Sequence, residues 1–222
     1  MKNTLTLIAT MFVLLSMMAC ASLRSIGVDF DIVGTGRIVD EQGSELGGPS
    51  RPLVQIPRLP GSLNPYGKLL YESKLFSAEL DLSSVFVTVA VENKSGSALQ
   101  VRFDQATVTS NFQHKPQPLR VFVAKANDQF VHAGKGRAPI AALPVSLEAG
   151  TKDAILFSAS YAQLYESERL FGVDFPPKQP VLLTTGVGNS ITYRIPVDHG
   201  AKRSYWIIEL TAKQATARPS YH

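Results

Sequence analysis

The residues able to do acid–base, nucleophilic or metal chemistry are few in this chain and widely spaced. No G-x-S-x-G or S-x-x-K motif marks a serine nucleophile, although a triad assembled by the fold stays open because triad order varies. Glu79 and Asp81 share a strand face, which is typical of a solvated charged surface. The histidines have no metal-ligand spacing: they are His114, His132, His199 and His222. The sequence therefore predicts no catalytic residue, no metal site and no cofactor, and we expect a protein that is not an enzyme.

The charge pattern argues against nucleic acid as a partner. The formal net charge is +4, and it falls to about +3 if the leader that carries Lys2 is removed. The tightest basic groups, at 135–137 and 202–203, are too short to follow a phosphate backbone, and no aromatic residues interleave with them. The two G-x-G pieces, at 34–36 and 186–188, do not extend to a dinucleotide motif and are typical of turns.

Cys20 is the only cysteine, and it comes directly after an apolar leader. Lys2 supplies a short positive region, and the mostly apolar run over 5–18 has the length of the hydrophobic part of a signal peptide. The run is shorter than the roughly 20 apolar residues that a transmembrane helix needs. We expect residues 1–19 to be a signal peptide.

The run LLSMMACA at 14–21 resembles the lipobox of bacterial lipoproteins. Ala19 is small, as that family requires before its cysteine, while Met17 stands where leucine is usual. The resemblance implies that Cys20 carries a diacylglyceryl thioether and an acylated amine, and several acyl chains anchor a protein stably. Ala21 stands where an aspartate would signal inner-membrane retention, so the resemblance implies an outer-membrane protein that faces the periplasm. Ordinary signal-peptide cleavage beside an incidental cysteine is the open alternative.

A segment rich in proline and glycine follows, over 41–66, and it predicts neither a helix nor a central strand. We assign 20–66 to a lipid-anchored N-terminal segment and linker. Val54, Ile56 and Leu59 are apolar residues within it, and they indicate a segment that docks in a groove of its own domain or of a partner. A solvated tether is the other reading. Ahead of the linker, 28–32 and 37–39 read as two short strands of a hairpin around the glycines at 34 and 36.

The chain from residue 67 to 213 has the pattern of a β-sandwich. Apolar β-branched residues alternate with polar ones over 84–92, a turn follows at 93–96, and the alternation resumes over 99–103, which predicts a hairpin. Further short strands separated by turn residues extend to 212, with one short helix expected over 162–171. Residues 214–222 read as a flexible tail.

The segment VTVAVENKSG at 87–96, followed by LQV at 99–101, resembles the central hairpin of immunoglobulin-like modules in bacterial envelope proteins. The resemblance implies an all-β, immunoglobulin-like β-sandwich behind an extended Pro/Gly-rich segment. It implies no chemistry, because function resides in sites and not in folds.

Two functions follow as expectations. The first is a non-enzymatic outer-membrane lipoprotein that acts as a structural or assembly component of an envelope complex for secretion, pilus formation or transport. Its partners would be the membrane, through the anchor, and envelope proteins that bind at Val54, Ile56 and Leu59 by strand addition or groove docking. The alternative is a periplasmic module that binds glycan, lipid or peptidoglycan fragments on an aromatic patch made by Tyr193, Tyr205 and Trp206.

Overall fold

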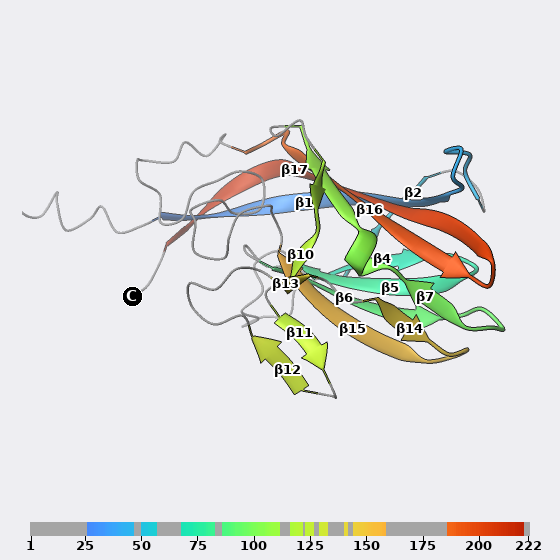
Figure 1. The fold of residues 1–222 in the computed structure, drawn as a ribbon. Coiled ribbons are helices and arrows are strands. Elements are labelled where there is room, and N and C mark those ends of the chain that lie inside the picture. The colour runs from blue at the N-terminus through green and yellow to red at the C-terminus, as the bar shows by residue number, and fades with distance from the viewer. Residues whose placement is uncertain are drawn as a thin grey trace, which may run out of the picture.

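The computed structural model shows an all-β protein built on two antiparallel sheets that face each other (Figure 1). It describes residues 26–46, 50–56, 68–82, 86–111, 116–121, 123–126, 129–132, 140–141, 144–158 and 186–219. The predicted β-sandwich is confirmed at this level, while the immunoglobulin-like resemblance stays a prediction. The helix expected over 162–171 lies outside the described residues.

The first sheet, sheet A, holds the longest strands. Its order is β14 (Val145–Leu147), β7 (Leu99–Val101), β16 (Ser190–His199), β17 (Lys202–Pro219), β1 (Ile26–Val39) and β2 (Arg51–Pro52). To one side, β8 (Thr107–Ser110) pairs with β16, and β9 (Gln117–Pro118) pairs with β8. β1 and β17 are paired from Ile26↔Pro219 to Val39↔Tyr205, that is, along the whole length of β1.

The second sheet, sheet B, packs across the core from sheet A. Its order is β12 (Gln129–His132), β11 (Val123–Ala126), β15 (Lys152–Ser158), β6 (Phe86–Asn93), β5 (Phe76–Leu82), β4 (Lys68–Glu72) and β3 (Val54–Ile56). A separate pair joins β10 (Arg120–Val121) to β13 (Ile140–Ala141).

The core lies between the sheets, because every second side chain of the main strands points inward. In β6 the inward residues are Val87, Val89 and Val91, each at most 1% exposed, as the alternation over 84–92 predicts. Opposite them, β16 and β17 contribute their own alternate residues, which include some of the largest buried side chains of the described part. The largest of all are Trp206, Tyr193, Phe76 and Phe103.

The predicted hairpin between 84–92 and 99–103 is wrong. β6 lies in sheet B between β5 and β15, whereas β7 lies in sheet A between β14 and β16. The chain therefore crosses from one sheet to the other at 94–98. The alternation of buried and exposed residues is the same for a crossing as for a hairpin, so the pattern cannot tell the two apart.

Buried Asn93 holds this crossing in place. Its Nδ2 donates to the carbonyl oxygens of Ser97, at 2.8 Å, and Leu147, at 3.0 Å, and its Oδ1 accepts from the Ser95 N–H at 2.9 Å. The side chain is 1% exposed, so each of these hydrogen bonds replaces one to water. One amide thus ties the end of a sheet B strand to a sheet A strand.

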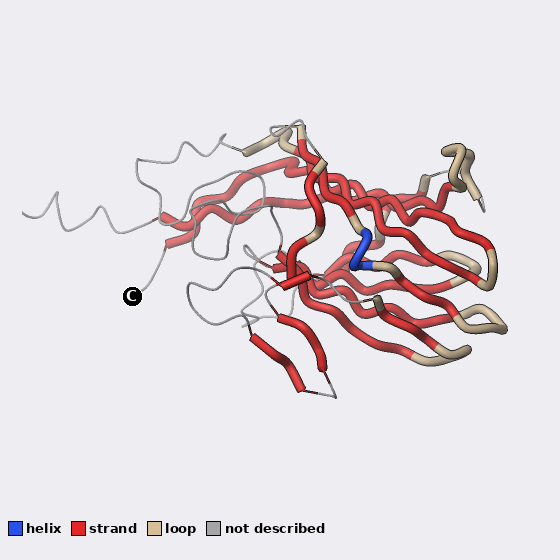
Figure 2. Tube along the Cα trace, in the orientation of Figure 1, coloured by secondary structure: helices blue, strands red, loops and turns tan. Residues whose placement is uncertain are grey.

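β7 and β8 are two parts of one line of pairing along β16, separated by a short 3₁₀ helix, η1 (Phe103–Gln105), drawn blue in Figure 2. The Arg102 N–H donates to the Pro196 carbonyl at 2.8 Å, but Pro196 has no N–H to complete the pair. Pairing with β16 therefore stops after Val101 and resumes at Thr107.

The expected hairpin at 28–39 is replaced by one continuous strand, β1. Gly34 and Gly36 lie on its inward face, where a Cβ on Gly34 would come within 2.5 Å of Leu53, and one on Gly36 within 2.4 Å of Tyr71. The glycines are thus positions of close approach and not turns, which is the other ordinary role of glycine in a strand.

Residues 51–56 close one side of the sandwich. β2 pairs with β1 in sheet A, β3 pairs with β4 in sheet B, and Leu53 between them is 7% exposed, with its N–H donating to the Gly34 carbonyl at 2.8 Å. This part of the predicted linker therefore docks on its own domain. The sandwich includes strands ahead of residue 67, and the boundary predicted there is wrong.

The predicted flexible tail is also corrected, because β17 continues to Pro219, paired with the start of β1. This pairing puts both ends of the described chain at one end of the molecule, which we call the terminal end (Figure 1). The turns at 40–45, 73–75, 94–98, 148–151 and 200–201 gather at the opposite end, which we call the loop end (Figure 2).

Candidate functional site

The aromatic patch predicted for ligand binding does not form. Tyr193 and Trp206 are 0% exposed and belong to the core, so neither can touch a ligand at the surface. Tyr205 lies on the outer face of sheet A, where the Arg194 guanidinium carbon sits 3.5 Å from its ring centroid. Neighbouring positions on a strand point to opposite faces, so Tyr205 and Trp206 cannot share a patch.

The predicted partner-binding residues lie at the edge of sheet B. Val54 and Ile56 belong to β3, the last strand of that sheet in the described part of the chain. Val54 is 61% exposed, the highest exposure among the large hydrophobic residues described, and Ile56 is partly exposed. Leu59 and Cys20 lie outside the described residues.

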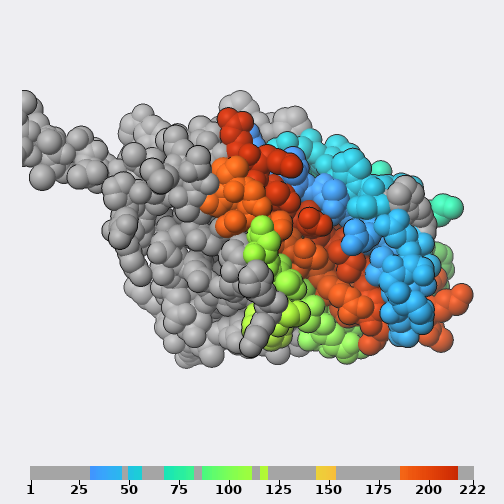
Figure 3. Space-filling model, turned by 90° about the horizontal axis from the view of Figure 1, so that it is seen from above, coloured from blue at the N-terminus to red at the C-terminus, as the bar shows by residue number. Residues whose placement is uncertain are grey.

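A pocket of about 240 Å³ lies beside this edge, and we call it the edge pocket. It sits toward the loop end, between β1, the segment that ends at Leu46, and the turn that joins β4 to β5. Figure 3 shows part of this end of the molecule, with residues 40–46 in blue close to residues 50–56 in cyan. The pocket is lined by Gly36, Arg37, Ile38, Leu46, Arg51, Tyr71, Glu72, Ser73, Lys74 and Leu75.

Most of the charged side chains that line the edge pocket are cations. Arg37, Arg51 and Lys74 contribute three cations, and none of them has an ion pair within the described residues. The single carboxylate of the lining, Glu72, lies 3.4 Å from Lys94. The pocket therefore presents positive charge beside an apolar wall.

The floor of the edge pocket is an aromatic cluster. Tyr71 is 4% exposed, with its ring centroid 5.6 Å from that of Phe76 and 5.4 Å from that of Trp206. Burial raises the pKa of Tyr71 to about 12, against a smaller opposing effect of Arg51, so its phenol is neutral at physiological pH. The absence of a side chain at Gly36 gives this ring its room.

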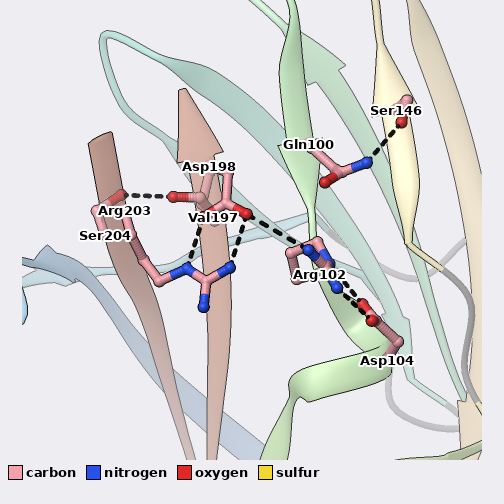
Figure 4. A network of polar contacts seen from close by, with 8 residues as sticks. All are labelled: Gln100, Arg102, Asp104, Ser146, Val197, Asp198, Arg203 and Ser204. Carbon is pink, nitrogen blue, oxygen red and sulfur yellow. Dashed lines mark hydrogen bonds and ion pairs between the residues drawn. The ribbon is translucent and has the colours of Figure 1, made fainter. Parts of the chain in front are cut away.

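A second group of polar residues lies on the outer face of sheet A (Figure 4). Asp198 on β16 accepts two hydrogen bonds from Arg203 on β17, at 2.7 and 2.9 Å, and lies 3.7 Å from the Arg102 guanidinium. Arg102 in turn donates two hydrogen bonds to Asp104, at 2.9 and 2.7 Å. These hydrogen bonds lower the pKa of both carboxyls, and the network satisfies its own charges.

Ser97 and His199 form the one contact at the loop end, among the described residues, that resembles a nucleophile and its base. The Ser97 Oγ lies 2.7 Å from His199 Nε2. Within the described part of the chain no third side chain forms a hydrogen bond with the His199 ring to orient it, as a serine hydrolase requires. We interpret the pair as a tie between the crossing at 94–98 and the β16–β17 turn.

The described residues contain no group of three or more histidine, cysteine, aspartate or glutamate side chains placed to hold a metal ion. Within the same part of the chain, no helix is both long and apolar enough to cross a membrane. Comparisons with family models, with curated proteins and with solved structures gave no match for this chain.

The sequence pointed to Val54 and Ile56 as residues of a linker and not of a sheet edge, and it gave no indication of the edge pocket. Its cations come from three separate places in the chain, at 37, 51 and 74, and no spacing links them. The one local signal was the pair Gly34 and Gly36, two residues apart on a single strand face. The two glycines indicate a close approach only once the positions of Leu53 and Tyr71 are known.

Proposed function

We propose that this protein is a non-enzymatic outer-membrane lipoprotein, anchored through Cys20 and facing the periplasm, which serves as a structural or assembly component of an envelope complex. The observation that carries the proposal is the edge of sheet B. There β3 exposes Val54, and on its other side the strand pairs with β4. An exposed edge strand offers unpaired backbone groups to an incoming strand.

The arrangement of the chain supports this role. The first described residue, Ile26, follows Cys20 by a span of at most about 20 Å, so an anchor at Cys20 would hold the terminal end near the bilayer. Arg37 lies about 36 Å along β1 from Ile26, at roughly 3.3 Å per residue. The edge pocket and the turns of the loop end would then point away from the membrane, toward other envelope proteins.

Co-purification with matched variants tests the proposal. Val54→Asp combined with Ile56→Asp should release the envelope partner, because two charges would replace the apolar side chains of the edge. Val33→Asp is the control, since Val33 is also an exposed strand valine, 46% exposed, but lies on the outer face of β1. The same partner recovered at equal yield with the double variant and with the control would contradict the assignment.

The alternative function, a module for glycan, lipid or peptidoglycan fragments, loses the aromatic site on which it was based, because Tyr193 and Trp206 are in the core. The edge pocket does not replace that site, because its volume of about 240 Å³ is below the range of about 300–1,000 Å³ usual for such ligands. A larger hollow of about 640 Å³ beside Gln100, Asp198 and Arg203 has no aromatic residue in its lining, so we retain the assembly role as the proposed function.

A further inference from the structure

We propose that the edge pocket binds one apolar side chain of an acidic, extended peptide segment in a partner protein, whose carboxylates lie against Arg37, Arg51 and Lys74. The proposal rests on the assembly role above and adds to it the chemistry of the segment that is recognised. It joins two neighbouring features, the exposed edge at Val54 and the pocket that begins three residues earlier at Arg51.

The volume and lining of the pocket fit a single side chain. About 240 Å³ accommodates a side chain of the size of leucine or phenylalanine. The wall that would contact it is built from Ile38, Leu46 and Leu75, with the buried ring of Tyr71 below. Leu46 is 45% exposed, so an inserted side chain would also cover apolar surface that now faces water.

The charges fit an acidic neighbour on either side of that side chain. The three cations have no ion-pair partner in the described residues, and the Glu72 carboxylate already lies near Lys94. Arginine is suited to this task, because its planar guanidinium can hold a carboxylate through two parallel hydrogen bonds. A basic peptide would meet repulsion at the same rim, so the charges select against it.

The location favours a peptide over an anionic lipid surface. With the terminal end near the bilayer, the edge pocket would stand roughly 36 Å along β1 from the first described residue. Lipid headgroups of that membrane would then lie beyond its reach, whereas a strand laid along β3 would pass within three residues of the pocket's Arg51. Backbone pairing would supply affinity, and the pocket would supply specificity.

Fluorescence anisotropy of the full chain in detergent tests the inference with a defined probe, a blocked and labelled peptide of sequence DDFDD. We expect it to bind at least about tenfold more tightly than DDSDD, which lacks the ring, and than KKFKK, which reverses the charge. Arg51→Glu combined with Lys74→Glu should weaken DDFDD about tenfold, since both substitutions place a carboxylate where the carboxylates of the peptide would bind. Leu46→Ser tests the apolar wall without changing charge and should weaken DDFDD but not DDSDD.

The control is Lys152→Glu combined with Lys213→Glu, two exposed lysines that are not part of the pocket lining, and it should change the affinity less than about twofold. Equal weakening by both double variants would overturn the site, and equal binding of DDFDD and DDSDD would overturn the insertion of a side chain. No preference for DDFDD over KKFKK would also overturn it. If vesicles with anionic lipid bind wild type but not the Arg51→Glu, Lys74→Glu variant, while DDFDD fails to bind, the occupant is a lipid surface and the proposal is wrong.

Failure of this inference and failure of the assembly role can be told apart. If the peptide does not bind but an envelope partner is still held at Val54, only the proposed peptide site in the edge pocket is wrong. If the peptide binds but no envelope partner is found in cells, the peptide site stands and the assembly role is wrong.

Discussion

Gly36 is the residue on which the geometry of the edge pocket depends most. A Cβ at this position would lie 2.4 and 2.7 Å from two carbons of the Tyr71 ring, and that ring is packed against Phe76 and Trp206. The ring cannot move aside without disturbing the aromatic cluster, so Gly36→Ala should lower the free energy of unfolding by about 1–3 kcal/mol, as overpacking of a core does. Urea unfolding of the variant and wild type measures the difference.

Gly96→Ala is the matched control. Gly96 lies in the crossing at 94–98, and a Cβ added there would meet no atom within 4 Å. The substitution should therefore change stability by only a few tenths of a kcal/mol, roughly the usual range for an exposed position. A loss for Gly36→Ala no larger than that for Gly96→Ala would show that Tyr71 can move, and that the packing described for the pocket floor is wrong.

Residue patterns predicted burial well where a side chain's surroundings follow from its own strand. The alternation of valines at 87, 89 and 91 is a local signal, and all three are buried as expected. The burial of Tyr193 and Trp206 was harder to predict, because an aromatic residue in a strand suits a core or a binding surface equally well. Only the pairing of β16 with β17 determines which face of sheet A these side chains occupy.

At the scale of elements, the charge network of Arg102, Asp104, Asp198 and Arg203 links β16 and β17 to the segment between β7 and β8 (Figure 4). The pKa of Asp104 is lowered by hydrogen bonds from Arg102, and that of Asp198 by hydrogen bonds from Arg203. A carboxyl whose pKa is lower in the folded state stabilises the fold above its unfolded pKa of about 3.9, and this contribution disappears as the pH falls through the folded value. Burial raises the pKa of Asp81. Ionised Asp81 therefore destabilises the fold, and this cost disappears as the pH falls, which opposes the effect of Asp104 and Asp198.

Asp198→Asn should therefore flatten the acid dependence of stability. We expect the loss of stability between about pH 5 and pH 2 to be smaller in the variant than in wild type, since the variant has one fewer proton to take up on unfolding in acid. Urea midpoints across this range measure it, with Glu148→Gln, an exposed turn residue, as the control. An unchanged slope in Asp198→Asn would mean that the hydrogen bonds from Arg203 do not persist in solution.

The path of the chain between elements was the part that the sequence could not supply. The short connection at 94–98 fits a hairpin and a crossing equally well, and the choice is made by Asn93 reaching Leu147, which lies 54 residues away. The segment 51–56 reads as a linker because of its prolines, yet it joins the edges of both sheets. In each case the deciding contact is distant in sequence.

At the scale of the whole molecule, the pairing of Ile26 with Pro219 places both ends of the described chain at the terminal end. If Cys20 is the anchor, the terminal end should lie closer to the bilayer than the loop end. The full-length protein in liposomes, labelled at a cysteine introduced by Gln214→Cys or by Gly96→Cys, tests this. A quencher attached to lipid headgroups should reduce fluorescence more at 214, near the terminal end, than at 96, in the loop end. Equal quenching at both positions would show that the domain lies flat on the membrane or is not anchored at Cys20.

In the proposed role, the edge at Val54 holds an envelope partner while Cys20 holds the membrane. A photo-crosslinking residue placed at position 54 of the full-length protein in intact cells tests it most directly, with position 33 as the matched exposed site and Cys20→Ser as the unanchored control. We expect an adduct with one envelope protein from position 54, absent from position 33, abolished by Ile56→Asp and reduced when the anchor is removed. Adducts of the same kind from both positions, or none from position 54 in an anchored protein, would contradict it.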